Sequence, residues 1–289
     1  MNNSQSSISI DSWAVAFRNS SRTAKCAKLS QCGDYVVTID DVDEVQVLRL
    51  STGDCWRVPV KGRAQSLAVS IADEFAVVSA SGNVQRFDLT LPTMCIGSLP
   101  VSGVSSIAYD PAGTTLAVAQ INGKLSVFDL HACPNPALIG LFRVSDRSIP
   151  IVCARRNSVL GVDRSGRLFY LHDAEAQSQI VWNGGDYLDV DCYTMAVHPL
   201  FTRIVVGGSG GYMRLYSTHN AVPVHLVTSF RFIRDLVFLA DFNLIAVVGD
   251  CGLEVWNLET KRVELSWKSS RGKVLAVRSV ENRLRVLYG

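Results

Sequence analysis

The chain has 289 residues, of which 48% are hydrophobic and 19% are charged, and its formal net charge is +2. This composition predicts a folded globular protein with a large apolar core and excludes an intrinsically disordered chain. A charge so close to neutral does not by itself indicate a nucleic-acid or membrane surface. No apolar run approaches the roughly 18 residues of a membrane span.

Eight cysteines are scattered along the chain without a Cys-x-x-Cys pair. Metal sites need clustered Cys or His ligands, so we predict neither a metal nor another cofactor. Cysteines within apolar stretches are typical of free thiols in a reducing compartment. The first residues lack the basic start and apolar core of a secretory signal. We therefore expect an intracellular protein, either cytoplasmic or nuclear.

The chain begins with residues 1–7, which are rich in Ser, Asn and Gln and are predicted to be a disordered tail. Residues 8–289 are predicted to form a single domain. Its first segment, residues 8–17, is expected to form one or two strands, because apolar and polar residues alternate there, most clearly over residues 13–17.

Short apolar strands then recur at a regular period. The middle residues of the first strand in each unit are Ala27, Ala68, Ala108, Cys153, Ala196, Val237 and Ala276, and successive ones lie 39 to 45 residues apart. Each of the first six units has room for four strands, of which the second is almost entirely apolar, as in a strand covered on both faces. A period of about 40–45 residues with four strands per unit is typical of a β-propeller.

The clearest unit is residues 105–130, with the sequence SSIAYDPAGTTLAVAQINGKLSVFDL. An apolar strand precedes a D-P-A-G turn at residues 110–113, a second strand leads to an N-G turn at residues 122–123, and a third strand ends in Phe128-Asp129. Asn-Gly between apolar runs is a strong hairpin signal. This order of strands and turns resembles a WD40 repeat, and the resemblance implies a propeller that holds other proteins in a complex.

Every unit departs from the WD40 pattern. Only Asp88 and Asp129 keep the terminal Asp, only Trp256 keeps the Trp, and the Gly-His pair that opens WD40 repeats is absent. The buried hydrogen-bonded network that these residues form in the family therefore cannot be complete here. Apolar packing must supply most of the stability.

The last unit contains only two predicted strands, over residues 273–279 and 284–288. We expect residues 8–17 to supply the missing outer strands of this blade, because closing the ring removes an exposed sheet edge. The predicted fold is all-β: a seven-bladed β-propeller of four-stranded antiparallel blades, whose last blade is closed by N- and C-terminal strands. The alternative is a six-bladed ring with a last blade that is open or completed by a partner strand, as in some coat and nuclear-pore propellers.

Motifs that could indicate catalysis have structural explanations. Residues 207–211 (GGSGG) match the G-x-S-x-G nucleophile pattern, but that motif needs a strand-to-helix elbow, and here a further strand follows. The five histidines are scattered, and His198 stands at the turn position that Asp110 holds in the third unit. No acid–base couple is indicated, and we predict that the protein is not an enzyme.

The distribution of charge is the functional feature that the sequence indicates. In a propeller, the connectors between blades lie on one face, and loops on a rigid scaffold commonly bind partners. Four neighbouring connectors are basic. Their candidate binding residues are Arg18, Arg22, Lys61, Arg63, Arg231, Phe232, Arg234, Lys268, Arg271 and Lys273, whereas the opposite connectors carry Asp186, Asp189 and Asp191.

This arrangement predicts a face that attracts an acidic, extended segment of a partner protein. Phe230 and Phe232 flank Arg231 in one connector. An exposed aromatic side chain beside Arg is a typical interface anchor, and the alternative is that either ring packs inward. Two other interpretations are solvated loop charges without a partner, and RNA, for which a more basic domain with repeated aromatics is expected. We predict a non-catalytic adaptor or scaffold in a multiprotein complex, with a coat or nuclear-pore component as the alternative.

Overall fold

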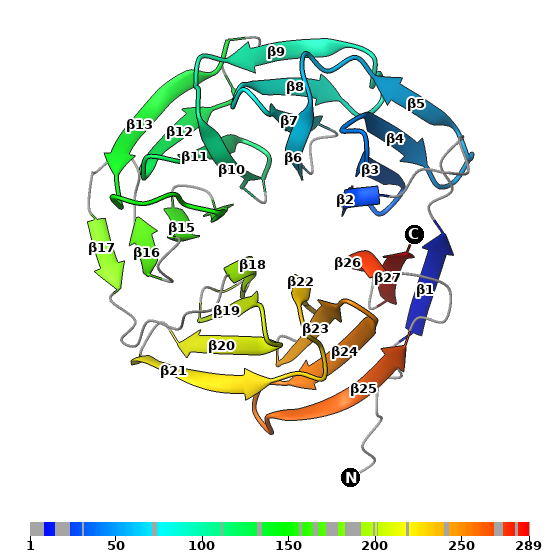
Figure 1. The fold of residues 1–289 in the computed structure, drawn as a ribbon, viewed down its shortest axis with the longest axis vertical. Coiled ribbons are helices and arrows are strands. Elements are labelled where there is room, and N and C mark those ends of the chain that lie inside the picture. Colours follow the sequence, from blue (N-terminus) through cyan, green and yellow to red (C-terminus); the bar gives the residue numbers. More distant parts are fainter. Residues whose placement is uncertain are drawn as a thin grey trace.

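A computed structural model shows the chain as a ring of β-sheets around a central axis (Figure 1). The structure describes residues 9–14, 24–30, 32–70, 74–110, 112–131, 135–155, 158–163, 167–171, 179–182, 192–198, 200, 202–217, 220–239, 243–268, 274–280 and 283–288. These residues form 27 β-strands and no helix. The predicted tail at residues 1–7 lies outside them.

Six four-stranded antiparallel blades make up most of the ring, and in each the strands follow one another in chain order. The first three blades are β2 (Ala24–Leu29), β3 (Tyr35–Asp40), β4 (Val45–Arg49) and β5 (Cys55–Val58); β6 (Ala64–Val69), β7 (Glu74–Ser79), β8 (Val84–Asp88) and β9 (Cys95–Leu99); β10 (Val104–Tyr109), β11 (Thr115–Gln120), β12 (Lys124–Asp129) and β13 (Ala137–Arg143).

The next three blades are β14 (Ile151–Arg155), β15 (Ser158–Val162), β16 (Leu168–Leu171) and β17 (Gln179–Trp182); β18 (Cys192–Val197), β19 (Arg203–Gly208), β20 (Tyr212–Ser217) and β21 (Asn220–Val227); β22 (Ile233–Phe238), β23 (Leu244–Gly249), β24 (Gly252–Asn257) and β25 (Arg262–Lys268). First strands such as β2, β6 and β22 lie nearest the axis, and fourth strands such as β5, β9 and β25 form the rim (Figure 1). The all-β propeller predicted from the repeats is confirmed.

The seventh sheet differs from the prediction. It contains three described strands in the order β1-β27-β26, where β1 is Ser9–Ala14, β26 is Val274–Val280 and β27 is Arg283–Tyr288. Strands from both ends of the chain do share this sheet, but β1 runs parallel to β27, with Ser9 beside Arg283.

The prediction of seven four-stranded antiparallel blades was therefore wrong for the last one: the described residues contain six such blades. The physical reason is that the third strand of this sheet comes from the other end of the chain. In the six complete blades a hairpin joins the second strand to the third and forces them to be antiparallel. No hairpin joins β27 to β1, so β1 can enter the third place in the parallel direction.

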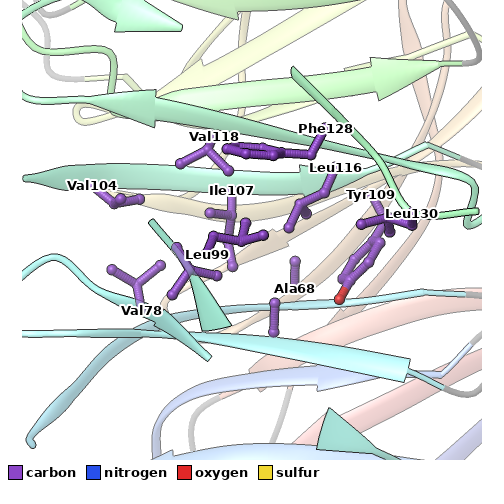
Figure 2. Packing of buried hydrophobic residues seen from close by; sticks show 12 residues of the cluster. Ala68, Val78, Leu99, Val104, Ile107, Tyr109, Leu116, Val118, Phe128 and Leu130 are labelled. Atoms are coloured by element: carbon purple, nitrogen blue, oxygen red, sulfur yellow. The ribbon is translucent and has the colours of Figure 1, made fainter. Parts of the chain in front are cut away.

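Apolar side chains between neighbouring blades form the core. Between the second and third blades, Val78, Leu116, Val118 and Phe128 are almost completely buried and pack against one another (Figure 2). Burying one such side chain contributes about 1.5–3 kcal/mol. Similar apolar clusters recur between other blades, so the ring is a rigid support for its loops. Apolar packing was expected to supply most of the stability because the WD40 hydrogen-bonded network is incomplete.

A buried ion pair within the second blade is hydrogen-bonded to the third blade. Arg86, only 1% exposed, donates from Nε to Oε1 of Glu74 at 2.6 Å and from Nη2 to Oε2 at 2.8 Å. The hydroxyl of Tyr109 donates to the same Oε1 at 2.6 Å. Burial and the neighbouring charge of Glu74 raise the pKa of Tyr109 well above its ordinary value. This network was not foreseen from the sequence.

Turns between first and second strands are held by side-chain acceptors. Oδ1 of Asp110 accepts hydrogen bonds at 2.7 Å from the N–H groups of both Thr114 and Thr115. In the fifth blade Nδ1 of His198 accepts a hydrogen bond from the N–H of Leu200 at 3.0 Å. The turn position predicted for His198 is confirmed, since the imidazole takes the place of the carboxylate.

Candidate partner-binding face

The connectors between blades and the hairpins between second and third strands lie at the same end of each blade, and we call this side of the ring the connector face. Backbone hydrogen bonds tie the two kinds of loop together. The N–H of Ala64 donates to the carbonyl of Asp43 at 3.1 Å, and the N–H of Ala80 donates to that of Arg63 at 2.6 Å. These bonds hold the connectors in fixed positions.

The basic residues predicted for this face are exposed where the structure describes them. Lys61, Arg63, Arg231, Arg234 and Lys268 are all exposed, and none forms an ion pair with a carboxylate among the described residues. Their charge is therefore available to a ligand. The other candidates and the opposing carboxylates, namely Arg18, Arg22, Arg271, Lys273, Asp186, Asp189 and Asp191, lie outside the described residues.

Other cations are paired at both ends of the blades, for example Lys25 with Asp43 on the connector face. At the other end of the blades, Nε of Arg49 lies 3.0 Å from Oδ2 of Asp34, and Nη2 of Arg203 lies 4.0 Å from Oε1 of Glu259. Burial alone would raise the pKa of Asp34, but hydrogen bonds from Arg49 and Ser51 outweigh it and lower the value.

The two phenylalanines that flank Arg231 have different roles. Phe230 is 6% exposed and packs over the backbone of Gly249, where a Cβ would lie 1.9 Å from its ring. Phe232 is 38% exposed, and the guanidinium carbon of Arg231 lies 5.8 Å from its ring centroid. A cation–π contact of this kind is worth about 0.5–1 kcal/mol at an exposed site. Of the pair, Phe230 therefore packs inward and Phe232 is exposed.

Tyr193 is a residue that sequence reasoning missed. It lies in β18, is 48% exposed, and its ring centroid is 6.3 Å from that of Phe232, with the rings tilted at 54°. The two rings form an exposed aromatic pair made by separate blades. The sequence indicated only that Tyr193 lies near the connector-face end of a first strand, and first strands lie beside the axis.

A glycine-rich hairpin at residues 207–211 supports this aromatic pair. Gly211 has a φ of +73° and its carbonyl accepts hydrogen bonds from the N–H and Oγ1 of Thr228, at 2.9 and 3.0 Å. Ser209 forms an isolated antiparallel bridge with Phe232. The predicted turn is confirmed, and its contacts hold the connector that carries Phe232.

A cavity of about 420 Å³ opens beside the aromatic pair, between the inner strands β2, β18 and β22. Tyr193, Phe232 and Arg234 line one part of it, and Cys26 and Lys28 line another. Burial raises the pKa of the Cys26 thiol, with smaller opposing effects from Lys28 and Asp235. The cavity wall at this point is therefore an uncharged thiol.

A second cavity of about 610 Å³ adjoins the first, because both are lined by Lys25 and Cys26. It extends along the connector-face ends of β2, β6 and β10 and is bordered by Arg63. Nζ of Lys25 is bonded to Oδ1 of Asp43. We call the two adjoining cavities the trough. Arg234 lines its first cavity and Arg63 its second, and the lining also includes the carboxylates Asp235 and Asp43.

Two kinds of feature are absent from the described residues. No three His, Cys, Asp or Glu side chains among them are arranged to hold a metal ion. The part of the chain that is described contains no helix long and apolar enough to cross a membrane. No family model matches the chain. No curated protein matches it either.

Proposed function

We propose that this protein is a non-catalytic, WD40-like propeller that acts as an adaptor or scaffold within a multiprotein complex, and that its connector face binds an acidic, extended segment of another protein. The observation that supports this most directly is the trough. Arg234 lines its first cavity and Arg63 its second, and both are exposed and without an ion-pair partner among the described residues.

An elongated trough with basic residues along it suits an extended chain better than a compact ligand. Carboxylates of such a segment would be attracted to the exposed cations, which raises the association rate and disfavours basic competitors. The connectors are held by backbone hydrogen bonds, so little conformational entropy is lost when a partner binds. An active site is not required for this role.

Two finer points belong to the same proposal. The three-stranded sheet serves as the seventh blade of a WD40-like ring, with β1 as its closing strand. The protein works in the cytoplasm or nucleus, a location that the free thiols among the described cysteines support.

The experiment is a pull-down with the variant Arg63→Glu/Arg231→Glu/Arg234→Glu. Its matched control, Arg49→Glu/Arg203→Glu/Arg262→Glu, reverses the same number of charges at the opposite end of the blades. We expect partners to be lost with the first variant and kept with the control, and binding of wild type to weaken as salt is raised. Equal partner recovery with both folded variants would refute the proposal.

A second candidate function has a specific observation in its favour. The sheet β1-β27-β26 has no fourth strand among the described residues, so β1 is an edge strand. Edge strands can accept a strand from another protein, as in a coat or pore component with a partner-completed blade. The two functions use different surfaces, and charge reversal on the connector face would leave this second one intact.

A further inference from the structure

We propose that the cavity between β2, β18 and β22 receives one aromatic or large aliphatic side chain of the bound acidic segment. This anchor, in addition to charge, decides which segments bind. The inference rests on the proposed function and adds to it the apolar residue that the partner must carry.

The mouth of the cavity is aromatic. Tyr193 and Phe232 both line it and both keep more than a third of their surface exposed, although aromatic side chains are usually well buried. Their tilted arrangement leaves ring surface that a third apolar group can cover. Deeper in the cavity, Ala27 and Ile233 continue the apolar wall.

Charged side chains lie both at the rim and in the lining of the cavity, and those in the lining other than Arg234 are paired. Arg234 is exposed at the rim, and Arg231 lies against the outer side of the Phe232 ring. Inside the cavity, Lys28 lies 3.5 Å from the carboxylate of Asp235, so its charge is largely compensated there. A partner segment with one apolar side chain in the cavity and acidic residues on either side of that side chain would match both the apolar wall and the cations at the rim.

The size and rigidity of the site fit an inserted side chain. A volume of about 420 Å³ falls within the range of about 300–1,000 Å³ that is typical of ligand pockets. Binding energy at protein interfaces is concentrated in such anchors, which fill a pocket surrounded by polar contacts. The bridge between Ser209 and Phe232 holds the mouth in place before a ligand arrives.

The test is selection of a random-peptide phage library on the wild-type protein, followed by fluorescence polarisation with the enriched peptides. We expect enriched sequences in which one aromatic or large aliphatic residue is flanked by Asp or Glu. Replacing that residue with Ser in the peptide should weaken binding at least about tenfold. Phe232→Ala and Tyr193→Ala should each have a similar effect, while their melting temperatures stay close to that of wild type.

Tyr212→Ala is the matched control, because Tyr212 is an exposed aromatic on the connector face that does not line the cavity. Its effect on affinity should remain within about twofold. Enriched peptides that lack a shared apolar residue, or that bind Phe232→Ala and Tyr193→Ala as tightly as wild type, would overturn the inference.

The outcomes also separate this inference from the proposed function. Acidic peptides without an anchor that lose affinity for Arg63→Glu/Arg231→Glu/Arg234→Glu would overturn the anchor and leave the acidic-segment adaptor standing. Enriched peptides with no acidic preference, or the absence of any enrichment, would count against both.

Discussion

Lys28 of β2 and Asp235 of β22 join the first and sixth blades across the seam of the ring. Nζ of Lys28 lies 3.5 Å from Oδ1 of Asp235, and the other carboxylate oxygen accepts a hydrogen bond from the N–H of Val277 in β26, also at 3.5 Å. The inner strand β26 packs against both β2 and β22. The carboxylate of Asp235 therefore connects three consecutive sheets, of which the middle one contains the paired strands β1 and β27.

We expect Asp235→Ala to lower the free energy of unfolding by about 1–3 kcal/mol, because it leaves backbone donors and Lys28 without this acceptor. Lys28→Met should cost less than about 1 kcal/mol, since the Lys28 side chain is 44% exposed and its ion pair is screened. Urea unfolding measures both values. Equal losses for the two variants would show that the ion pair, and not the backbone contacts of Asp235, stabilises the seam.

Removal of residues 1–14 should abolish cooperative folding or cause aggregation, because it deletes β1 and exposes the edge of β27. Removal of residues 1–7 is the control, since it leaves β1 in place. Thermal unfolding and size-exclusion chromatography distinguish the outcomes. A shortened chain that folds and keeps its partners would show that β1 does not close the ring, and would favour completion by a partner strand.

Tyr109→Phe should reduce stability at neutral pH by about 1–3 kcal/mol, the value of a hydrogen bond to a charged acceptor. The raised pKa of Tyr109 means that the protonated phenol stabilises the folded state. Its contribution is complete below the unfolded pKa of about 10 and is lost as pH rises toward the higher folded value. The difference in unfolding free energy between wild type and Tyr109→Phe should therefore shrink above about pH 10. A constant difference, or the same behaviour in Tyr212→Phe, would contradict this.

Gly211→Ala and Gly53→Ala form a matched pair, because both glycines have positive φ angles, +73° and +77°. A Cβ at Gly53 would have no atom within 4 Å. Gly53→Ala should therefore lower the free energy of unfolding only by the backbone strain, about 1–2 kcal/mol. At Gly211 the Cβ would lie 2.1 Å from the carbonyl oxygen of Phe230. Gly211→Ala should therefore unfold at lower urea than Gly53→Ala and should also weaken binding at Phe232. Equal midpoints for the two variants would contradict the close approach.

Hydrophobic periodicity was sufficient to predict the blades. All seven residues predicted at the centres of first strands, from Ala27 to Ala276, lie in the observed first strands. This succeeded because second strands packed on both faces are continuously apolar and turn residues separate them. The direction of β1 could not be predicted, because the pattern of apolar side chains along a strand is the same in parallel and antiparallel pairing.

The candidate site was predicted in part. The exposure of the described connector cations could be predicted from loop position, but loop position could not distinguish exposed Phe232 from buried Phe230. Tyr193 and Lys25 could not be identified from the sequence. Both lie in first strands, and β18 and β2 come to line the same cavity only when the ring forms. The buried pair Glu74–Arg86 was missed for a similar reason, since its partner Tyr109 belongs to another blade.

The parallel pairing of β1 with β27 determines where fusion partners would emerge. Ala14 and Tyr288 are paired at one end of the two strands, and Tyr288 is also paired with Val274 at the connector-face end of β26. Ser9 and Arg283 lie at the other end. A fluorescent protein or affinity handle appended after Tyr288 would leave from the connector face, whereas one placed before Ser9 would leave from the opposite end of the blade. Amino-terminal attachment therefore keeps the connector face more accessible to ligands.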